Sequence, residues 1–282
     1  MRPLLILLLL LVQNSFAIER RVDAERIAAN RLEIREAIPL TMEHAVTRDE
    51  LEWGLMQRRN LPDSYGMLFH YPAPWKISLW SFNCFIDFSV AFLDCNQVIR
   101  ELRDLHSFPE KMCSLAPVRN LQDLRAISPK SQIFQFFNKR STVAALPALY
   151  CFETNIRWFQ ENGVQIGDFM GWDQENGVGW IALTVDISCL SPNFYRPYVI
   201  TPENPTAVSF WLAADPSPRD IAFLDGEGRV LQMGLLPGGA SYPPQTRPVL
   251  ASNGPVTHIV VAAAGWLASQ GITVGDELQL FP

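Results

Sequence analysis

The stretch Arg157–Asp168 reads RWFQENGVQIGD, and it returns at Gly265–Asp276 as GWLASQGITVGD. In each stretch a short segment after a tryptophan leads to a glycine, which can end a helix in the left-handed conformation. A Gly-Asp pair then marks a turn, and the C-terminal stretch continues into ELQLF. Each stretch therefore predicts a short helix followed by the last strand of a β-rich unit.

A second pair of matched blocks lies upstream of these stretches. Leu79–Asp94 and Phe210–Asp225 both begin with an apolar residue before a tryptophan and end in Ala-Phe-Leu-Asp. The sequence offset between these two blocks is larger than the offset between the two stretches above, so the first copy carries extra residues between its blocks. Collinear blocks with matched internal spacing predict a tandem duplication, with copies over residues 39–172 and 179–282 and a polar linker over residues 173–177.

Short apolar runs fill the rest of each copy. Runs such as 66–71, 77–82 and 88–93 are rich in aromatic and β-branched residues, and Gly, Pro, Asn and Asp separate them. This pattern is typical of many short strands, and DGEG at residues 225–228 is a hairpin turn between two of them. We therefore predict a mainly β fold (β-rich α+β): two tandem barrel-like β domains, each with a short helix before its last strand.

Residues 1–17 have the pattern of a secretory signal peptide. Arg2 precedes an apolar run over residues 4–12, and Ser15 and Ala17 provide small residues at the −3 and −1 positions of a cleavage site. This apolar run is too short for a membrane span, which needs about 20 residues. We expect cleavage after Ala17 to leave an exported chain that begins at Ile18, periplasmic or extracellular, with no membrane span.

Residues 18–38 form a charged segment after the signal peptide. Five acids and five bases surround Val22, Ile27, Leu32 and Ile34, which recur at near-helical spacing. This spacing predicts a solvated helix or linker over residues 18–38.

Composition and charge exclude two classes of protein. Hydrophobic residues make up 48% of the 282 residues, more than a disordered chain contains. The formal net charge of −6 argues against a nucleic-acid binder, which presents a basic face. The predicted insertion in the first copy, at about residues 103–147, has a charge balance of +4, and the second copy has −4. The insertion could dock the two copies on each other, bind an anionic envelope component, or be a solvated excursion.

The sequence contains no G-x-S-x-G, Walker, G-x-G-x-x-G or H-E-x-x-H motif. None of the four histidines has a metal-ligand spacing to another His or to a Cys, so we predict no metal and no cofactor. The five cysteines are an odd number, which leaves at least one thiol outside any intrachain disulfide. Buried free thiols are expected for most of them, and a Cys84–Cys95 disulfide is the alternative.

The first copy resembles the DUF192 (UPF0127) family of bacterial and archaeal proteins, which has no established activity. The family pattern runs G-L-M-x-R-x-x-L, G-M-L-F, F-W-M-K-N-T, L-D-I-x-F-I-D, V-L-E and a closing G-I-x-x-G-D. Matching residues extend over most of the copy: Gly54-Leu55-Met56, Arg58, Leu61, Gly66-Met67-Leu68-Phe69, Trp80, Asn83, Phe92, Asp94, Phe152-Glu153 and Gly167-Asp168. The second copy is degenerate and keeps Phe210-Trp211, Asp220, Asp225, Gly265 and Gly275-Asp276.

Both copies depart from the polar positions of that pattern. The family's Lys-Asn pair reads Phe82-Asn83 in the first copy and Ala213-Ala214 in the second. The Asp of L-D-I falls on Ser89 and Asp220, and the Glu of V-L-E falls on Glu153 and Val261. The resemblance therefore implies that the site of an ordinary family member is broken or redistributed in this chain.

Six residues are candidates for a ligand site, and none is predicted to be catalytic. The matched tryptophans are either walls of a binding site or core residues, and Arg58 and Glu153 either share a site or form a structural ion pair. The six candidates are Arg58, Trp80, Asn83, Glu153, Trp211 and Asp220.

Export and the incomplete polar set favour a non-catalytic binding or structural protein of the bacterial cell envelope. Its partner would be an envelope component or a small ligand, and the two copies are expected to pack on each other. The alternative is a periplasmic hydrolase of an envelope glycan or another polymer, which needs two converging carboxylates such as Glu153 and Asp220. A metal-binding exported protein is the third hypothesis.

Overall fold

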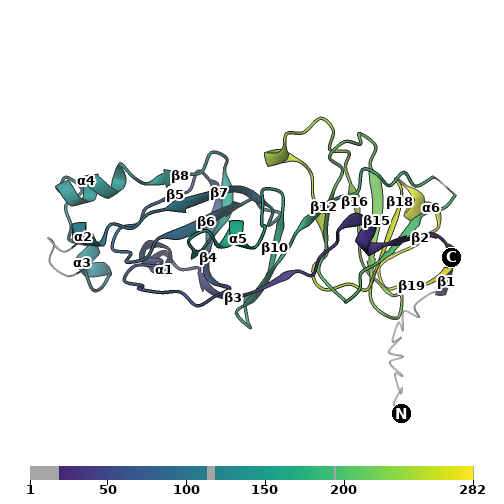
Figure 1. The fold of residues 1–282 in the computed structure, drawn as a ribbon, viewed down its shortest axis with the longest axis horizontal. Helices are drawn as coiled ribbons and strands as arrows, with labels where there is room; N and C mark the ends of the chain where they lie inside the picture. Colours follow the sequence, from purple (N-terminus) through teal and green to yellow (C-terminus); the bar gives the residue numbers. More distant parts are fainter. Residues whose placement is uncertain (1–18, 113–117, 194, 282) are drawn as a thin grey trace, which may run out of the picture.

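A computed structural model describes residues 19–112, 118–193 and 195–281. The predicted signal peptide and Cys113 lie outside these residues. Strands dominate the described chain, which confirms the predicted β-rich class. They form two lobes that lie side by side along the long axis of the molecule (Figure 1).

The first lobe is built on a seven-stranded sheet. Its two edges meet where Val98 bridges to Phe169 and the amide of Ile99 donates to the carbonyl of Asp168 at 2.8 Å. The sheet therefore curls into a barrel-like unit, as predicted. In spatial order its strands are β10 (Phe169–Asp173), β11 (Val178–Ala182), β3 (Ile38–Ala45), β4 (Tyr65–Trp75), β9 (Ala148–Asn155), β6 (Phe88–Leu93) and β7 (Ile99–Leu105).

The second lobe repeats this closure with other strands. Arg229 bridges to Glu277, and the amide of Val230 donates to the carbonyl of Asp276 at 2.9 Å. Its five-stranded sheet contains, in spatial order, β16 (Val230–Leu236), β15 (Arg219–Leu224), β18 (His258–Ala263), β13 (Tyr198–Thr201) and β2 (Glu25–Ala28). Smaller sheets are β1 (Glu19–Asp23) with β19 (Glu277–Phe281), and β12 (Thr184–Asp186) with β14 (Ser209–Trp211) and β17 (Leu250–Ala251).

Several elements recur at the offsets found in the sequence. β6 and β7 recur as β15 and β16 at the offset that separates Trp80 from Trp211. β10 recurs as β19 at the shorter offset that separates Asp168 from Asp276. The same shorter offset relates α5 (Trp158–Glu161) to α6 (Trp266–Ser269), the short helices predicted before the last strands. The residue before each helix is left-handed, with φ of 63° before α5 and 81° before α6.

The predicted helix over residues 18–38 is wrong. Residues 19–28 form β1 and β2, and only η1 (Ala29–Leu32) is helical, as a 3₁₀ turn. β1 pairs with β19 and β2 pairs with β13, both in parallel. The prediction failed because the partners lie far along the chain, and because the buried Ala24 completes an alternation with Val22 that the larger apolar residues did not reveal.

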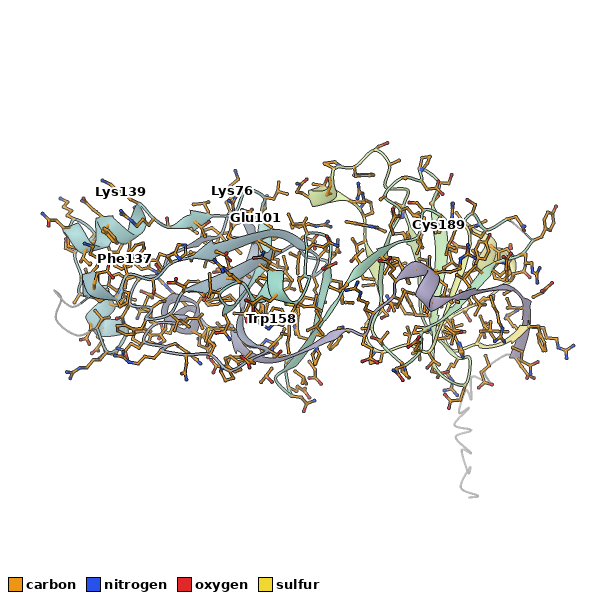
Figure 2. The ribbon with its side chains drawn as sticks, viewed as in Figure 1. Lys76, Glu101, Phe137, Lys139, Trp158 and Cys189 are labelled. Atoms are coloured by element: carbon orange, nitrogen blue, oxygen red, sulfur yellow. The ribbon has the colours of Figure 1, made fainter. Side chains whose placement is uncertain are left out.

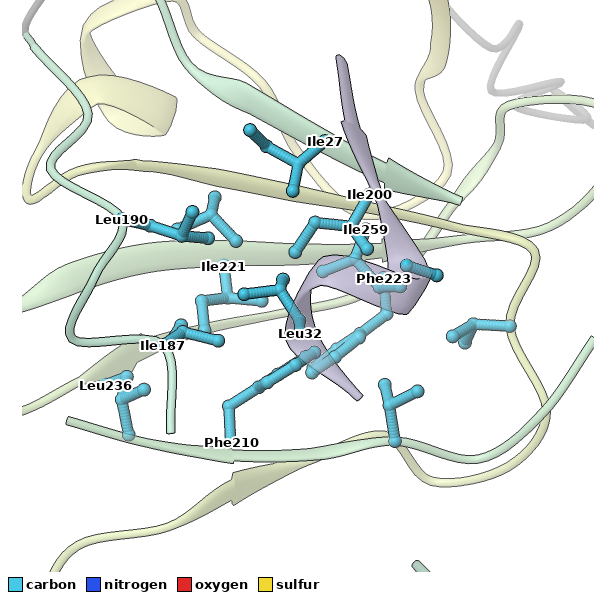
Figure 3. Packing of buried hydrophobic residues seen from close by; sticks show 14 of the residues in the cluster. Ile27, Leu32, Ile187, Leu190, Ile200, Phe210, Ile221, Phe223, Leu236 and Ile259 are labelled. Atoms are coloured by element: carbon cyan, nitrogen blue, oxygen red, sulfur yellow. The ribbon is translucent and has the colours of Figure 1, made fainter. Parts of the chain in front are cut away.

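The N-terminal segment packs into the core of the second lobe. Ile27 and Leu32 are buried against Phe210 and Phe223, whose rings stack at 6.4 Å between centroids (Figure 3). The chain then crosses to the first lobe as β3 (Figure 1). The second lobe therefore takes residues from both ends of the chain.

The insertion at residues 103–147 forms part of the first lobe's outer wall. Phe137 packs edge-on against Phe82 at 5.2 Å between centroids. Phe137 and Lys139 lie at the end of the molecule remote from the second lobe (Figure 2), so the insertion does not dock the two lobes. Its described elements are α2 (Pro109–Met112), α3 (Leu121–Arg125), α4 (Gln132–Asn138) and β8 (Thr142–Val143), which pairs with β5 (Ser78–Leu79).

The two faces of the first lobe's sheet bury different residues. On the inner side Phe152 packs with Leu68, Met170 and Trp158, which comes from α5. On the outer side Cys151 packs with a second apolar cluster that also lies beneath α1 (Arg48–Trp53) and the segment 76–88. Because side chains alternate along a strand, Glu153 shares the outer side with Cys151.

The lobes contact each other through β12 and the loop before β10. The hydroxyl groups of Thr184 and Ser209 lie 2.7 Å apart, and the amide of Thr184 donates to Asp168 Oδ1 at 2.7 Å. Arg100 Nη1 donates to the carbonyl of Arg247 at 3.0 Å. Over the described ranges, no helix has the length and apolar character needed to cross a membrane.

Candidate functional site

The outer side of the first lobe contains a cavity of about 130 Å³ that both Trp80 and Glu153 line. α1 and the turn after it, β4, and the segment 78–84 form its other walls. Four parts of the family pattern contribute to it, through Gly54-Leu55-Met56, Phe69, Trp80 and Glu153. The cavity is therefore the place where that pattern converges.

Glu153 lies in the middle of the sheet, on β9 between β4 and β6. It is opposite Met67 on one side and Val90 on the other, and the residue is only 4% exposed. Within the described chain, no residue donates a hydrogen bond to its carboxyl group. Burial alone raises the pKa of Glu153 to about 8, because a low-dielectric site disfavours the charged form.

Three weakly acidic groups lie close to this carboxyl group. Burial, first, and the neighbouring Glu153 raise the pKa values of the Cys84 and Cys151 thiols. Burial, then Cys151 and Glu153, raise the pKa of Tyr71. At neutral pH all four side chains are therefore uncharged in the empty cavity. The sequence analysis did not identify Tyr71 as a candidate. Side chains alternate in direction along β4, so the position two residues after Phe69 could have been expected on the same side.

Aromatic rings form much of the cavity wall. Trp80 stacks on Phe82 with 5.1 Å between ring centroids and an interplanar angle of 27°. Phe134 of the insertion packs edge-on against Trp80, also at 5.1 Å. The insertion therefore supports Trp80 with an aromatic side chain. The aromatic lining residues are Trp53, Phe69, Tyr71, Trp80 and Phe82.

Asn83 supports the loop that carries these rings. Its backbone is left-handed, with φ of 55°, a conformation that Asn tolerates. Its side-chain Nδ2 donates to the carbonyl of Val118 at 3.0 Å, and its own carbonyl accepts from the amide of Gln57 at 2.7 Å. Asn83 therefore forms hydrogen bonds to neighbouring loops beside the cavity.

Arg58 lies in a neighbouring cavity of about 460 Å³. Its guanidinium group forms an ion pair with Glu43, and the Tyr65 hydroxyl also donates to Glu43. Trp53 and Gly54 line both cavities, so the two are adjacent. Arg58 and Glu153 nevertheless form neither of the arrangements expected from the sequence, since each lines its own cavity and Arg58 pairs with Glu43.

Trp211 and Asp220 lie in the second lobe, away from the other candidates. Trp211 packs on Gly167, and Arg247 stacks over its ring at 4.7 Å. Asp220 Oδ2 accepts a hydrogen bond from the amide of Leu267 in α6 at 3.0 Å. The structure therefore does not bring Glu153 and Asp220 together, and the carboxylate pair proposed for a hydrolase is wrong.

A histidine pair is the second feature that the sequence did not reveal. His44 Nδ1 lies 2.9 Å from His70 Nε2, because β3 and β4 run in parallel next to each other. Burial, and then the charge of His44, lowers the pKa of His70 to about 4. In the described part of the chain, no three His, Cys, Asp or Glu side chains gather as they would around a metal ion.

The cysteines are unpaired as far as the structure describes them. Cys84 and Cys151 are buried free thiols, as expected, and Cys95 and Cys189 are exposed free thiols. The alternative of a Cys84–Cys95 disulfide is therefore wrong.

Comparisons with known proteins identify a family but no activity. The family model DUF192, described as "Uncharacterized ACR", matches residues 31–172 of the 282. No curated protein matches the chain. Among solved structures, a "putative transcription regulator" from Sinorhizobium meliloti 1021 is 21% identical with a TM-score of 0.33, over 48% of this chain and 92% of that one. A protein of unknown function from Novosphingobium aromaticivorans DSM 12444 is also 21% identical with a TM-score of 0.33, over 49% of this chain and 85% of that one.

Proposed function

The chain belongs to the DUF192 family through its residues 31–172, and from this premise we propose that it is a binding protein whose small ligand occupies the cavity between Trp80 and Glu153. The observation that carries this proposal is the buried carboxyl group of Glu153, which faces a cavity and has no hydrogen-bond donor among the described residues. A buried polar group without a partner costs free energy. A ligand that supplies the partner recovers that cost.

The chemistry of the cavity supports binding without turnover. A thiolate is the reactive form of cysteine, and burial raises the pKa values of both Cys84 and Cys151. The Glu153 carboxyl group is protonated at neutral pH in the empty cavity, since burial raises its pKa to about 8. Protonated thiols and a protonated carboxyl group are poor nucleophiles, whereas they are compatible with ligand recognition.

We also propose that the protein works in the bacterial cell envelope as an exported chain. The signal-peptide pattern of residues 1–17 supports this location. The recurrence of strands and helices at the two offsets of the sequence repeats supports a tandem duplication as the origin of the two lobes. On this proposal the first lobe keeps the ligand site, and in the second lobe the equivalent tryptophan, Trp211, packs on Gly167.

Ligand-observed NMR with a panel of neutral, anionic and cationic molecules of about benzene size tests the proposed function. Ser78 is exposed and lines the cavity, so Ser78→Trp should block it, whereas Lys76→Trp adds the same side chain at an exposed position outside it. We expect binders whose signals disappear with Ser78→Trp and persist with Lys76→Trp. Binders that are indifferent to Ser78→Trp, or an empty panel, would contradict the proposal.

A further inference from the structure

Acidic residues and aromatic faces line the cavity. Among the described residues that line it, Glu52 and Glu153 are acidic, and none is Lys, Arg or His. Five of them are aromatic, and the aromatic face attracts cations because its quadrupole is negative there. Cages of such rings recognise quaternary ammonium groups. Resting on the proposed function, we propose that the ligand is a small organic cation, a quaternary or tertiary ammonium group, with Glu153 as its counter-ion.

The two acids are not equivalent. Arg125 donates to Glu52 Oε2 from Nη2 at 2.6 Å and from Nε at 3.1 Å, so the charge of Glu52 is already compensated at the surface. Glu153 has no such partner among the described residues and is 4% exposed. The free counter-ion of the cavity is therefore Glu153.

The volume limits the size of the cation. The cavity measures about 130 Å³, and an engineered protein cavity of about 150 Å³ admits benzene. A trimethylammonium group has a similar size to benzene, whereas a nucleotide or an oligosaccharide is too large for the cavity. Choline and tetramethylammonium are therefore suitable probes.

Binding of a cation should be linked to the loss of a proton. The titratable groups that face Glu153 are Tyr71 from β4, Cys84 from the loop before β6 and Cys151 from its own strand, and burial raises the pKa values of all three. Glu52, from α1, is paired with Arg125. The Glu153 carboxyl group itself is protonated below about pH 8 in the empty cavity. Because a neighbouring cation favours the carboxylate, the proton leaves Glu153 for the solvent when the cation enters.

Titration calorimetry with choline and with 3,3-dimethylbutan-1-ol, its neutral isostere, tests this assignment. We expect choline to bind about tenfold or more tightly than the alcohol at pH 9. The affinity for choline should fall more than about tenfold between pH 9 and pH 6, since the ionised fraction of Glu153 falls with its pKa of about 8. The affinity for the alcohol should be the same at both pH values.

Two variants separate the role of Glu153 from that of general negative charge. Glu153→Gln should reduce the affinity for choline to that of the alcohol and abolish its pH dependence. Glu52→Gln is the matched control, and it should retain the pH dependence. The comparison of pH 9 with pH 6 needs no variant, so it stands even where Glu153→Gln does not fold.

The outcomes separate this inference from the proposed function. An alcohol that binds as tightly as choline at pH 9, or a choline affinity that is independent of pH, would show that the cavity takes a neutral ligand and that Glu153 is no counter-ion. The proposed function then survives without the cation. Failure of choline, tetramethylammonium and every member of the neutral and anionic panel would overturn both.

Discussion

The carboxyl group of Glu153 and the indole ring of Trp80 line the same cavity, although one comes from the central strand β9 and the other from a loop outside the sheet. Phe82 and Phe134 hold the indole ring in place. No described residue donates a hydrogen bond to the carboxyl group. This combination of a fixed aromatic wall and an unpaired buried acid is the basis of the predictions on stability and binding.

The pH dependence of stability should reveal the state of Glu153. Its pKa is about 8 in the folded chain and 4.5 for an unperturbed Glu. Between these values the folded state binds more protons than the unfolded state, so the free energy of unfolding falls as the pH rises. Glu153→Gln does not titrate. We therefore expect it to gain stability relative to the parent between pH 4.5 and pH 8, by on the order of a few kcal/mol.

Urea unfolding at pH 5, 6.5 and 8 measures this difference. Asp168 titrates in both chains and cancels in the comparison. Burial raises the pKa of Asp168 to about 6, so its titration changes the stability of each chain near that pH and leaves the difference between them unaltered. Parallel stability curves for the parent and the Glu153→Gln variant would contradict an unpaired buried carboxyl group.

The contact between the lobes should require a glycine at position 167. Its φ is +101°, and a Cβ atom there would lie 2.3 Å from Cζ3 of Trp211. Gly275 has a similar φ of +96° with no atom within 4 Å of its Cβ position. Both Gly→Ala variants carry the backbone cost of about 1 kcal/mol, and Gly167→Ala should lose about 1–3 kcal/mol more through overpacking.

Thermal unfolding of the two variants provides the measurement. Trp211→Leu, which removes the ring, should bring Gly167→Ala close to Gly275→Ala. Equal losses for the two glycine variants in the parent chain would show that Trp211 does not pack on Gly167.

Asp220 should matter for stability and not for ligand binding. Its carboxyl group accepts from the amide of Leu267 at 3.0 Å, and Ser89 accepts from the amide of Arg157 at 2.8 Å at the corresponding place in the first lobe. Asp220→Ala should lose about 1–2 kcal/mol of unfolding free energy, as expected for a helix cap. Denaturant unfolding measures this loss. A loss of choline affinity at unchanged stability would return Asp220 to the ligand site.

Export should remove the predicted signal peptide. The small residues at positions 15 and 17 predict cleavage after Ala17. Expression of the full chain in a bacterium and intact mass spectrometry of the envelope fraction should give a chain that begins at Ile18. A mass that includes Met1–Ala17 in that fraction would show that the segment is retained.

The sequence predicted local structure better than the assembly of the lobes. The blocks around Trp158 and Trp266 correctly predicted a short helix before each last strand, because the glycines at the turns adopt the left-handed conformation that the pattern requires. The role of residues 19–28 could not be predicted in the same way. Their charged side chains face outward, and only the distant partners β13 and β19 turn the segment into strands.

The candidate site was also only partly predictable from the sequence. Trp80 and Glu153 belong to a motif pattern, which identifies residues without showing where they meet. Trp80 and Glu153 meet because the Glu153 side chain lies on the outward face of β9. Trp211 and Asp220 lie in the other lobe, apart from them. Tyr71 and the two buried thiols have no motif. Alternation of side chains in the folded sheet places Tyr71 and Cys151 beside Glu153, and the loop before β6 brings in Cys84.

Methionine methyl groups provide the most direct test of an organic-cation site in this cavity. Met56 lines the cavity that holds Glu153, and Met67 lines the adjacent cavity that holds Arg58. In a chain labelled with ¹³C at its methionine methyl groups, titration with choline at pH 9 should shift the Met56 signal more than the Met67 signal. The assignment is made with Met56→Leu and Met67→Leu. A shift at Met67 without one at Met56, or no shift at either, would contradict the account.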